Sequence, residues 1–240
     1  MKTALITGAS RGIGSAIAKQ LAKDGFRVIV NYNAAEQQAK QLILELNNTY
    51  GINCTTFRAD VSDRAQVEAM FAAAGGVDVL INNAGIAQQK LFTDLTEQDW
   101  DSMFDVDVKG VFHCCQCALP HMIHQKRGKI INISSMWGQV GASCEVHYSA
   151  AKAAVIGLTK ALAKEVGPSN IQVNCVAPGV IQTEMNAHLD ENTISELKEE
   201  TPLGIIGAAS DIASAVSFFA GEESNFITGQ ILGVNGGLII

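Results

Sequence analysis

A tyrosine and a lysine four residues apart form the pair in this sequence best suited to moving a proton. Tyr148 and Lys152 occur in the string Y-S-A-A-K, and on a helix residues i and i+4 share one face. A cation beside a phenol favours the ionised form, so we expect the pKa of Tyr148 to lie below its free value of about 10. Such a phenol can donate or accept a proton near neutral pH.

A serine stands where it can act with this pair. Ser135 closely follows the apolar run Ile130–Ile133, which is typical of a buried strand. A hydroxyl at the exit of that strand can hydrogen-bond a carbonyl oxygen held by the same tyrosine. The Tyr-x-x-x-Lys spacing also occurs by chance on surface helices, so the rest of the chain must decide between the two interpretations.

A glycine-rich turn follows the first predicted strand, Thr3–Thr7, and opens a helix marked by apolar residues at helical spacing. Gly8 permits a tight turn, while Gly12 and Gly14 let the backbone approach a pyrophosphate on the amides of the helix N-terminus. The spacing G-x-x-x-G-x-G differs from G-x-G-x-x-G, and a purely structural turn is the alternative. Its place at the first strand-to-helix junction favours a dinucleotide cofactor.

The second predicted strand, Arg27–Val30, indicates which dinucleotide. A site for NAD usually has an acid near the end of this strand for the ribose 2′-hydroxyl. Here Asn31 follows the strand, and the first acid is Glu36. Arg11 in the glycine turn would offer a cation to a 2′-phosphate, so we predict NADP (NADPH). The alternative is that Arg11 is simply a solvated loop residue.

The next two predicted strands, Cys54–Ala59 and Val77–Ile81, also end in polar residues. Asp60 either accepts from an adenine amino group or caps the helix that begins near Ser62 and Asp63. The second strand runs into Asn82-Asn83-Ala84-Gly85, whose small residues allow close passage under a ribose. The two asparagine side chains are placed to tie neighbouring strand ends together.

Composition limits the classes of protein. The 240 residues suit one α/β domain over residues 1–240, and a net charge of −7 argues against a nucleic-acid partner. No apolar run approaches the roughly 20 residues of a membrane span, and no signal-peptide pattern opens the chain. Cys114 and Cys117 lie inside a helical run, which favours buried reduced thiols over a redox or metal site. We expect no metal and a cytoplasmic location.

Five motifs in order resemble the short-chain dehydrogenase/reductase family: T-G-A-S-R-G-I-G (7–14), N-N-A-G (82–85), Ser135, Y-S-A-A-K (148–152) and P-G (178–179). The resemblance runs from residue 3 to the final G-V-N-G-G (233–237), and is strongest to the 3-oxoacyl-(acyl-carrier-protein) reductase subgroup. It implies a doubly wound α/β fold of Rossmann type, with a mainly parallel seven-stranded sheet flanked by helices.

The resemblance also implies residue roles. Tyr148 protonates a carbonyl oxygen as a hydride arrives from the nicotinamide, Lys152 lowers the pKa of Tyr148 and holds the nicotinamide ribose, and Ser135 positions the carbonyl. The implied cofactor contacts are Gly8, Ser10, Arg11, Gly12, Ile13, Gly14, Asn31, Asp60, Val61, Asn83, Ala84, Gly85, Tyr148, Lys152, Pro178, Gly179, Ile181 and Thr183. The expected substrate contacts are Ser135, Met136, Trp137, Glu145 and Tyr148.

The chain departs from the family pattern at a fourth catalytic position. In the family an asparagine within N-V-K-G holds a water on its backbone carbonyl, which links the lysine to solvent. Here the string is D-V-K-G, with Asp107 in a predicted helix over Glu97–Gln125. The carbonyl survives the change, and a nearby carboxylate favours a charged Lys152, so we expect an active enzyme with an altered pH profile. The alternative is a tolerated near-isostere.

The expected activity is NADPH-dependent reduction of a ketone to a secondary alcohol, on a small ketone or a carrier-bound 3-oxoacyl group. The predicted lid, Gln182–Gly204, is strongly acidic; it is either a solvated face or a surface that repels an acidic carrier and suits a cationic or neutral ketone. Trp137–Val146 is also similar to reductases of the 5-aminopentanone group on elongation factor P. Against this alternative, Lys126, Arg127 and Lys129 form a predicted basic patch where related reductases dock acyl carrier protein.

Two further expectations concern the state of the protein. A cofactor-binding protein that has lost catalysis is the alternative of another class, and Asp107 is its only motivation. In the family, the helix that holds Asp107 and the helix after Tyr148 form one dimer face, and the last strand forms a second. The apolar C-terminus, Gly236–Ile240, is consistent with burial between subunits, so we predict a homotetramer.

Overall fold

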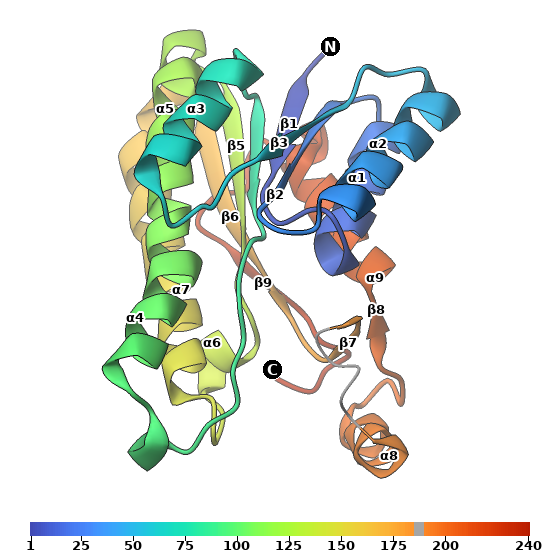
Figure 1. Cartoon of the computed structure of the whole chain (residues 1–240), viewed down its shortest axis with the longest axis vertical. Coiled ribbons are helices and arrows are strands. Elements are labelled where there is room, and N and C mark those ends of the chain that lie inside the picture. The colour runs from blue at the N-terminus through green and yellow to red at the C-terminus, as the bar shows by residue number, and fades with distance from the viewer. Residues whose placement is uncertain (185–189) are drawn as a thin grey trace.

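The computed structural model describes residues 1–184 and 190–240. Its centre is a parallel sheet of seven strands in the order β3-β2-β1-β4-β5-β6-β9 (Figure 1). Strand β1 pairs with both β2 and β4, so the strand order reverses beside it, where doubly wound sheets bind ligands. The strands are β1 (Thr3–Ile6), β2 (Arg27–Tyr32), β3 (Thr55–Arg58), β4 (Val79–Asn82), β5 (Gly128–Ile133), β6 (Ile171–Pro178) and β9 (Ile231–Val234).

Helices cover both faces of the sheet, which confirms the predicted fold class (Figure 1). One face carries α1 (Gly12–Lys23), α2 (Glu36–Tyr50) and α9 (Ala209–Ala220), and the other carries α3 (Arg64–Ala74), α4 (Glu97–Phe104), α5 (Gly110–Gln125) and α7 (Val146–Val166). Each layer has its own apolar core: Ile17, Leu21 and Val216 belong to the first, and Met70, Met122 and Val155 to the second.

The helix predicted over residues 97–125 is interrupted in its middle. Helix α4 ends at Phe104, a π-helical turn occupies Asp105–Lys109, and α5 begins at Gly110. Single π-helical turns inside longer helices are frequent at functional sites. Asp107, at the centre of this turn, is fully buried.

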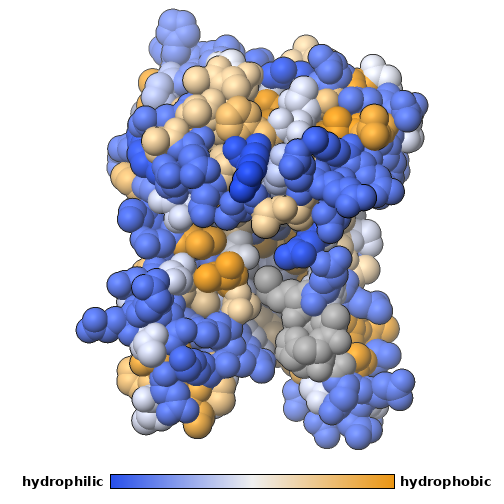
Figure 2. All heavy atoms as spheres, in the orientation of Figure 1, coloured by the Kyte–Doolittle hydropathy of each residue, from blue (hydrophilic) through white to orange (hydrophobic). Residues whose placement is uncertain are grey.

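The carboxyl ends of the strands face the end of the molecule that carries three short elements: α6 (Trp137–Val140), α8 (Glu191–Glu200) and the paired strands β7 (Ile181–Gln182) and β8 (Gly207–Ala208). This is the lower end in Figure 1. In the space-filling view a hollow divides this end between the side with α4 and α6 and the side with α8 (Figure 2). None of the helices in the described ranges is both long and apolar enough to cross a membrane.

Candidate active site

Helix α7 brings Tyr148 and Lys152 together, as their spacing predicts. Lys152 Nζ lies 5.6 Å from the centre of the Tyr148 ring. The lysine is 5% exposed, and its ammonium donates a hydrogen bond to the Ile133 carbonyl at the end of β5 (3.3 Å). Lys152 is therefore buried and Tyr148 partly exposed on a helix packed against the sheet, so their spacing is not a chance pattern on a surface helix.

Ser135 completes the predicted triad of polar side chains. It follows β5, is 8% exposed, and forms a side-chain hydrogen bond with Tyr148. Its Oγ also accepts from the Trp137 backbone N–H (3.2 Å), which holds the side chain against the first turn of α6. The Met136 side chain, predicted as a substrate contact, is 2% exposed, and its N–H donates to the Pro178 carbonyl (2.9 Å). Met136 therefore links the ends of β5 and β6.

Asp107 forms a buried ion pair with Lys152. Its Oδ2 lies 2.9 Å from Lys152 Nζ, and its Oδ1 accepts the backbone N–H of Ile86 (2.8 Å). Gly85 leaves the room that this pair needs, since a Cβ there would lie 2.8 Å from Asp107 Oδ2 and 3.1 Å from Lys152 Nζ. The π-helical turn, the loop after β4 and α7 thus meet at one pair of charges.

The electrostatics of the site correct one prediction. Burial by itself would lower the pKa of Lys152, but the Asp107 carboxylate outweighs it and the pKa is raised, so the lysine stays charged as predicted. The pKa of Tyr148 is also raised, although we expected it to be lowered. Burial is the main cause, and the Asp107 and Glu145 carboxylates add to it, against the opposing effects of Lys152 and the Ser135 hydrogen bond.

The glycine turn and the N-N-A-G string are locked together. Gly8 has φ +60°, and a Cβ there would lie 2.8 Å from the Cα of Ala84. The Asn83 side chain donates to the carbonyls of Thr7 (2.9 Å) and Gly8 (3.0 Å), while the N–H groups of Asn83 and Ala84 both donate to Thr7 Oγ1 (3.0 Å each). Asn82 in turn donates to Asn132 Oδ1 on β5 (2.8 Å), so both asparagines tie strand ends as predicted.

Asn31 fixes the glycine turn through hydrogen bonds of its side chain to the backbone. It lies inside β2, is 1% exposed, and its Oδ1 accepts the Gly8 N–H (3.1 Å) while its Nδ2 donates to the Ala59 carbonyl (2.9 Å). Val61 is also buried, and it packs against the backbone of Gly110: a Cβ added to Gly110 would lie 2.7 Å from Val61 Cγ2. The side chains of both residues, predicted as cofactor contacts, thus hold the scaffold around the turn.

Asp60 does not cap α3. That helix is capped by Asp63, whose side chain accepts the N–H groups of Ala65 and Gln66 (2.9 and 3.2 Å). Asp60 instead accepts from Ser62 through its Oδ1 and from Asn33 Nδ2 through its Oδ2 (3.0 Å). The capping alternative was wrong, and the adenine contact stays a prediction.

Arg11 was predicted to contact the cofactor, but the arginine that lies at the end of β2 is Arg58. Arg11 is exposed and pairs with Glu184 (3.3 Å). Arg58 ends β3 directly opposite Tyr32 of β2, and its Nε donates to the Asn33 carbonyl (3.1 Å). The signal was available, because a basic residue that ends a strand adjacent to β2 lies at the same sheet edge as the glycine turn.

The segment after β6 closes over the glycine turn. The position of a Cβ on Gly12 would lie 3.9 Å from Thr183 Cβ, and the Gly179 N–H donates to the Val234 carbonyl (2.9 Å). The predicted contacts Pro178, Gly179, Ile181 and Thr183 therefore gather at the end of β6 and in β7. Of the predicted lid over Gln182–Gly204, residues 185–189 lie outside the described part of the chain, and its acidic helix α8 is solvent-exposed.

A polar network lies beside Tyr148 at the start of α7. His147 is fully buried and its Nε2 lies 3.0 Å from Gln88 Oε1. The Gln88 side-chain amide donates to Asp99 Oδ1 (2.9 Å), and Lys90 donates to Asp99 Oδ2 (2.7 Å). The segment between β4 and α4 is thereby fixed against the start of α7.

The predicted basic patch near β5 is smaller than expected. Lys129 is 7% exposed, and its ammonium bonds to the Gly221 carbonyl and to Ser224 Oγ (2.7 Å). Arg127 pairs with Asp78 (3.1 Å). Residues at the start of a strand alternate between the protein interior and solvent, which a count of charges along the sequence does not capture. Lys126 and Arg127 are both exposed, and Arg127 is paired with Asp78. All six cysteines are free thiols.

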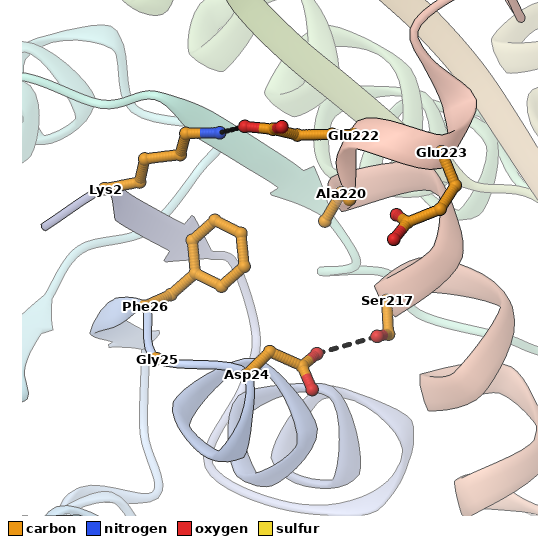
Figure 3. A pocket seen from close by; sticks show the side chains of 9 residues that line it. Lys2, Asp24, Gly25, Phe26, Ser217, Ala220, Glu222 and Glu223 are labelled. Atoms are coloured by element: carbon orange, nitrogen blue, oxygen red, sulfur yellow. Dashed lines mark hydrogen bonds and ion pairs between the residues drawn. The ribbon is translucent and has the colours of Figure 1, made fainter.

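A cavity of about 540 Å³ lies at the opposite end of the sheet. It is lined by residues around the start of β1 and the ends of α1 and α9, where Lys2 pairs with Glu222 and Ser217 bonds to Asp24 (Figure 3). None of the candidate catalytic residues lines this cavity. The chemistry therefore belongs to the carboxyl ends of the strands.

Comparisons with known proteins agree with this geometry. Residues 2–194 match the short chain dehydrogenase family. The chain is 43% identical to the 3-oxoacyl-(acyl-carrier-protein) reductase FabG of Staphylococcus aureus strain Mu50, over 99% of this chain and 98% of that protein, and 40% identical to the FabG of Aquifex aeolicus, over 99% and 97%. Among solved structures, it resembles a 3-oxoacyl-(acyl-carrier protein) reductase from Brucella melitensis, with a TM-score of 0.95 and 33% identity over 100% of this chain and 91% of that one. It also resembles a gluconate 5-dehydrogenase from Burkholderia cenocepacia in complex with NADP and tartrate, with a TM-score of 0.93 and 35% identity over 99% and 94%. The chain therefore belongs to the short chain dehydrogenase family of oxidoreductases.

Proposed function

We propose that this protein is an NADPH-dependent reductase that converts a ketone to a secondary alcohol, and that its natural substrate is a 3-oxoacyl thioester. The observation that carries the proposal is the arrangement of buried Ser135 and Lys152 around the partly exposed Tyr148, with the Asp107 carboxylate behind the lysine. These groups provide two hydrogen-bond donors and a cation where negative charge develops on a ketone oxygen during reduction.

Each of these four side chains has a different role in transferring the proton to the ketone oxygen. Ser135 donates a hydrogen bond that orients the ketone oxygen, and Tyr148 gives its phenolic proton to that oxygen as negative charge builds there. Lys152 stabilises the tyrosinate that is left, and Asp107 keeps the lysine charged within a buried site. Bound NADPH supplies the hydride. Because burial raises the pKa of Tyr148, the phenol carries its proton at neutral pH and is ready to donate it.

The glycine turn fits a phosphorylated dinucleotide. Gly12, with φ +56°, and Gly14 keep side chains away from the N-terminus of α1, whose amides favour phosphate. Arg58 supplies positive charge near the end of β2, and Arg11, paired with Glu184, is a cation of the glycine turn, while the first acid after β2, Glu36, is engaged with Lys40 (2.6 Å). This charge distribution favours a 2′-phosphate, and hence NADPH over NADH.

A carrier-bound 3-oxoacyl group is the substrate most in keeping with the named relatives. The predicted docking surface around Lys126 lies next to the start of β5, at the end of the sheet opposite the reacting side chains, where the Asn170 side chain donates to the Lys126 carbonyl (3.1 Å). With Lys129 buried and Arg127 paired, we expect this docking surface to be weakly charged. We further propose a cytoplasmic location, whose reducing conditions suit six free thiols.

Turnover tests the proposal directly. NADPH oxidation is measured with an acetoacetyl thioester for the wild type and for Tyr148→Phe, and NADPH binding is measured separately by fluorescence. We expect the variant to bind NADPH and to lose at least about 100-fold in kcat, because it lacks the proton donor. Equal rates for both proteins would refute the assignment of Tyr148. Binding without turnover by the wild type would instead favour a cofactor-binding protein that has lost catalysis.

We also propose a homotetramer. Strand β9 leaves one edge of the sheet open, Leu232 on it is 38% exposed, and Ile240 at the chain end is fully exposed. On the α4–α5 side, Trp100 and Phe112 are 37% and 48% exposed. Sedimentation velocity at micromolar concentration should give a tetramer for the wild type and smaller species for Phe112→Asp. A monomeric wild type would refute this proposal.

A further inference from the structure

The Glu145 carboxylate stands beside the reacting tyrosine. It occupies the position just before α7 begins and is partly buried. Glu145 is the N-cap and Tyr148 the third residue of α7, two positions that lie near each other at the start of a helix. Burial is the main cause of the raised pKa of Tyr148, and the Glu145 charge adds to it.

Glu145 is held by the segment that faces it across the site. The Gln89 side-chain amide donates to Glu145 Oε1 (3.2 Å), and the Lys90 backbone N–H donates to the Cys144 carbonyl (2.8 Å). One residue farther along, His147 meets Gln88 (3.0 Å). These three contacts join the segment after β4 to the start of α7, so the carboxylate is fixed in place near the mouth of the site.

The charge of Glu145 is balanced differently from that of the other acids around the site. Lys152 is matched by Asp107 at 2.9 Å, and Lys90 is matched by Asp99 at 2.7 Å. The partner that the structure gives Glu145 is the neutral amide of Gln89. A substrate substituent that reaches this place therefore meets a net negative potential in a partly buried setting, where charges interact more strongly than in water.

We propose that Glu145 is a specificity-determining residue that rejects ketones bearing a carboxylate near the carbonyl and admits those that are neutral or positively charged there. The inference rests on the proposed ketoreductase function and deepens it. A 3-oxoacyl group is neutral at this position when it is esterified, and anionic when it is a free 3-oxo acid. The Glu145 charge therefore confines the enzyme to 3-oxo acids whose carboxylate is esterified, and a preceding acyl-transfer reaction must supply these esters.

Three ketones with the same reacting acetoacetyl group test this role of Glu145: acetoacetate (anionic), ethyl acetoacetate (neutral) and acetoacetylcholine (cationic). For Glu145→Gln, we expect kcat/KM for acetoacetate relative to ethyl acetoacetate to rise about tenfold over the wild type, and the ratio for acetoacetylcholine to fall several-fold. Ratios are used because any change in Tyr148 itself affects all three ketones alike. Salt should weaken the discrimination of the wild type.

Two variants serve as controls. Glu165→Gln makes the same change at an exposed position near the other end of α7 and should leave both ratios unchanged. Glu145→Asp keeps the charge and should retain most of the discrimination, which separates charge from shape. Ratios that do not move in Glu145→Gln, or that move equally in Glu165→Gln, overturn this role of Glu145 while turnover of ethyl acetoacetate still supports the ketoreductase. If the wild type turns over none of the three ketones, both proposals fail.

Discussion

Replacing Asp107 with asparagine should move the pH profile of the enzyme to lower pH. The substitution keeps the shape of the side chain and an oxygen for the Ile86 N–H (2.8 Å), but removes the negative charge next to Lys152. Asp107 is one of the causes that raise the pKa of Tyr148. Without its charge, the Lys152 ammonium acts on the phenol uncompensated, so tyrosinate forms more easily.

The geometry sets the size of the shift. Separations of 2.9 Å from Asp107 Oδ2 to Lys152 Nζ and 5.6 Å from Nζ to the ring centre place the carboxylate no more than about 8.5 Å from the centre of the phenol ring. At an effective dielectric constant of about 20, two charges about 8 Å apart interact by about 2 kcal/mol, or about 1.5 pKa units. Lys152 also loses a partner and is less firmly charged, so we expect a net shift of about one unit.

The sign of the effect differs between the two reaction directions. Ketone reduction needs the protonated phenol, so its rate falls as the pH rises through the pKa of Tyr148, and in Asp107→Asn that fall should come about one unit lower. Alcohol oxidation needs tyrosinate, so its rate should rise at correspondingly lower pH. Initial rates in both directions over a pH series measure this.

Asp105→Asn, in the same π-helical turn but exposed and paired with Lys109, is the matched control and should behave as the wild type. Superimposable profiles for Asp107→Asn and wild type would refute a role for the carboxylate, and a shift to higher pH would show that the electrostatic reasoning has the wrong sign.

Three further predictions follow from other contacts. Gly85→Ala places a Cβ 2.8 Å from Asp107 Oδ2, which must open the buried ion pair, so we expect kcat to fall at least about tenfold. The control is Gly157→Ala, at a position on α7 with open space, which should keep the wild-type kcat. A normal kcat in Gly85→Ala would contradict the packing argument. Arg11→Ala combined with Arg58→Ala should raise KM for NADPH about tenfold relative to KM for NADH, and an unchanged preference would assign it to other groups. Burial lowers the pKa of Lys129 to about 8, below the usual value for lysine of about 10.4. Between these two values Lys129 is protonated in the unfolded chain but not in the folded protein. The free energy of unfolding should therefore rise with pH from about 8 to 10. Chemical denaturation across that range should show a flatter rise for Lys129→Met, and an equal slope would contradict the pKa shift.

The sequence predicted the architecture well because the strands are short apolar runs with turn residues at their ends. Ile130–Ile133 lies within β5, and the helices that follow the glycine turn and Tyr148 occur where their spacing placed them. The strand ends were less certain: β2 runs on to Tyr32, so that Asn31 is part of a strand and not of the loop after it. Polar residues end a strand in most sequences, but here the buried Asn31 side chain finds backbone partners on both sides.

The interior of the site was harder to foresee. Nothing local predicts the π-helical turn at Asp105–Lys109, because its register is set by how α4 packs on α7 and how α5 packs on α3 and the sheet. The pairing of Glu145 with Gln89 joins residues 56 positions apart and depends on the path of the segment after β4. Arg58 was missed for a similar reason, since its closeness to Asn33 comes from strand order and not from sequence distance.

The direction of the Tyr148 pKa shift shows where local reasoning fails and what the protein gains from it. A lysine one helical turn away lowers the pKa of a phenol by a local effect that sequence spacing reveals. Burial and the Asp107 carboxylate, which is distant in sequence, raise it through contacts that only the fold creates, and Glu145 adds to this from three residues away. A higher pKa makes the phenol a weaker acid but keeps the proton in place, and a reductase uses that proton. Since Asp107 holds Lys152 charged, the lysine remains able to stabilise the tyrosinate that each turnover produces. The acidic surroundings therefore bias the site toward reduction at neutral pH, and alcohol oxidation requires more alkaline conditions.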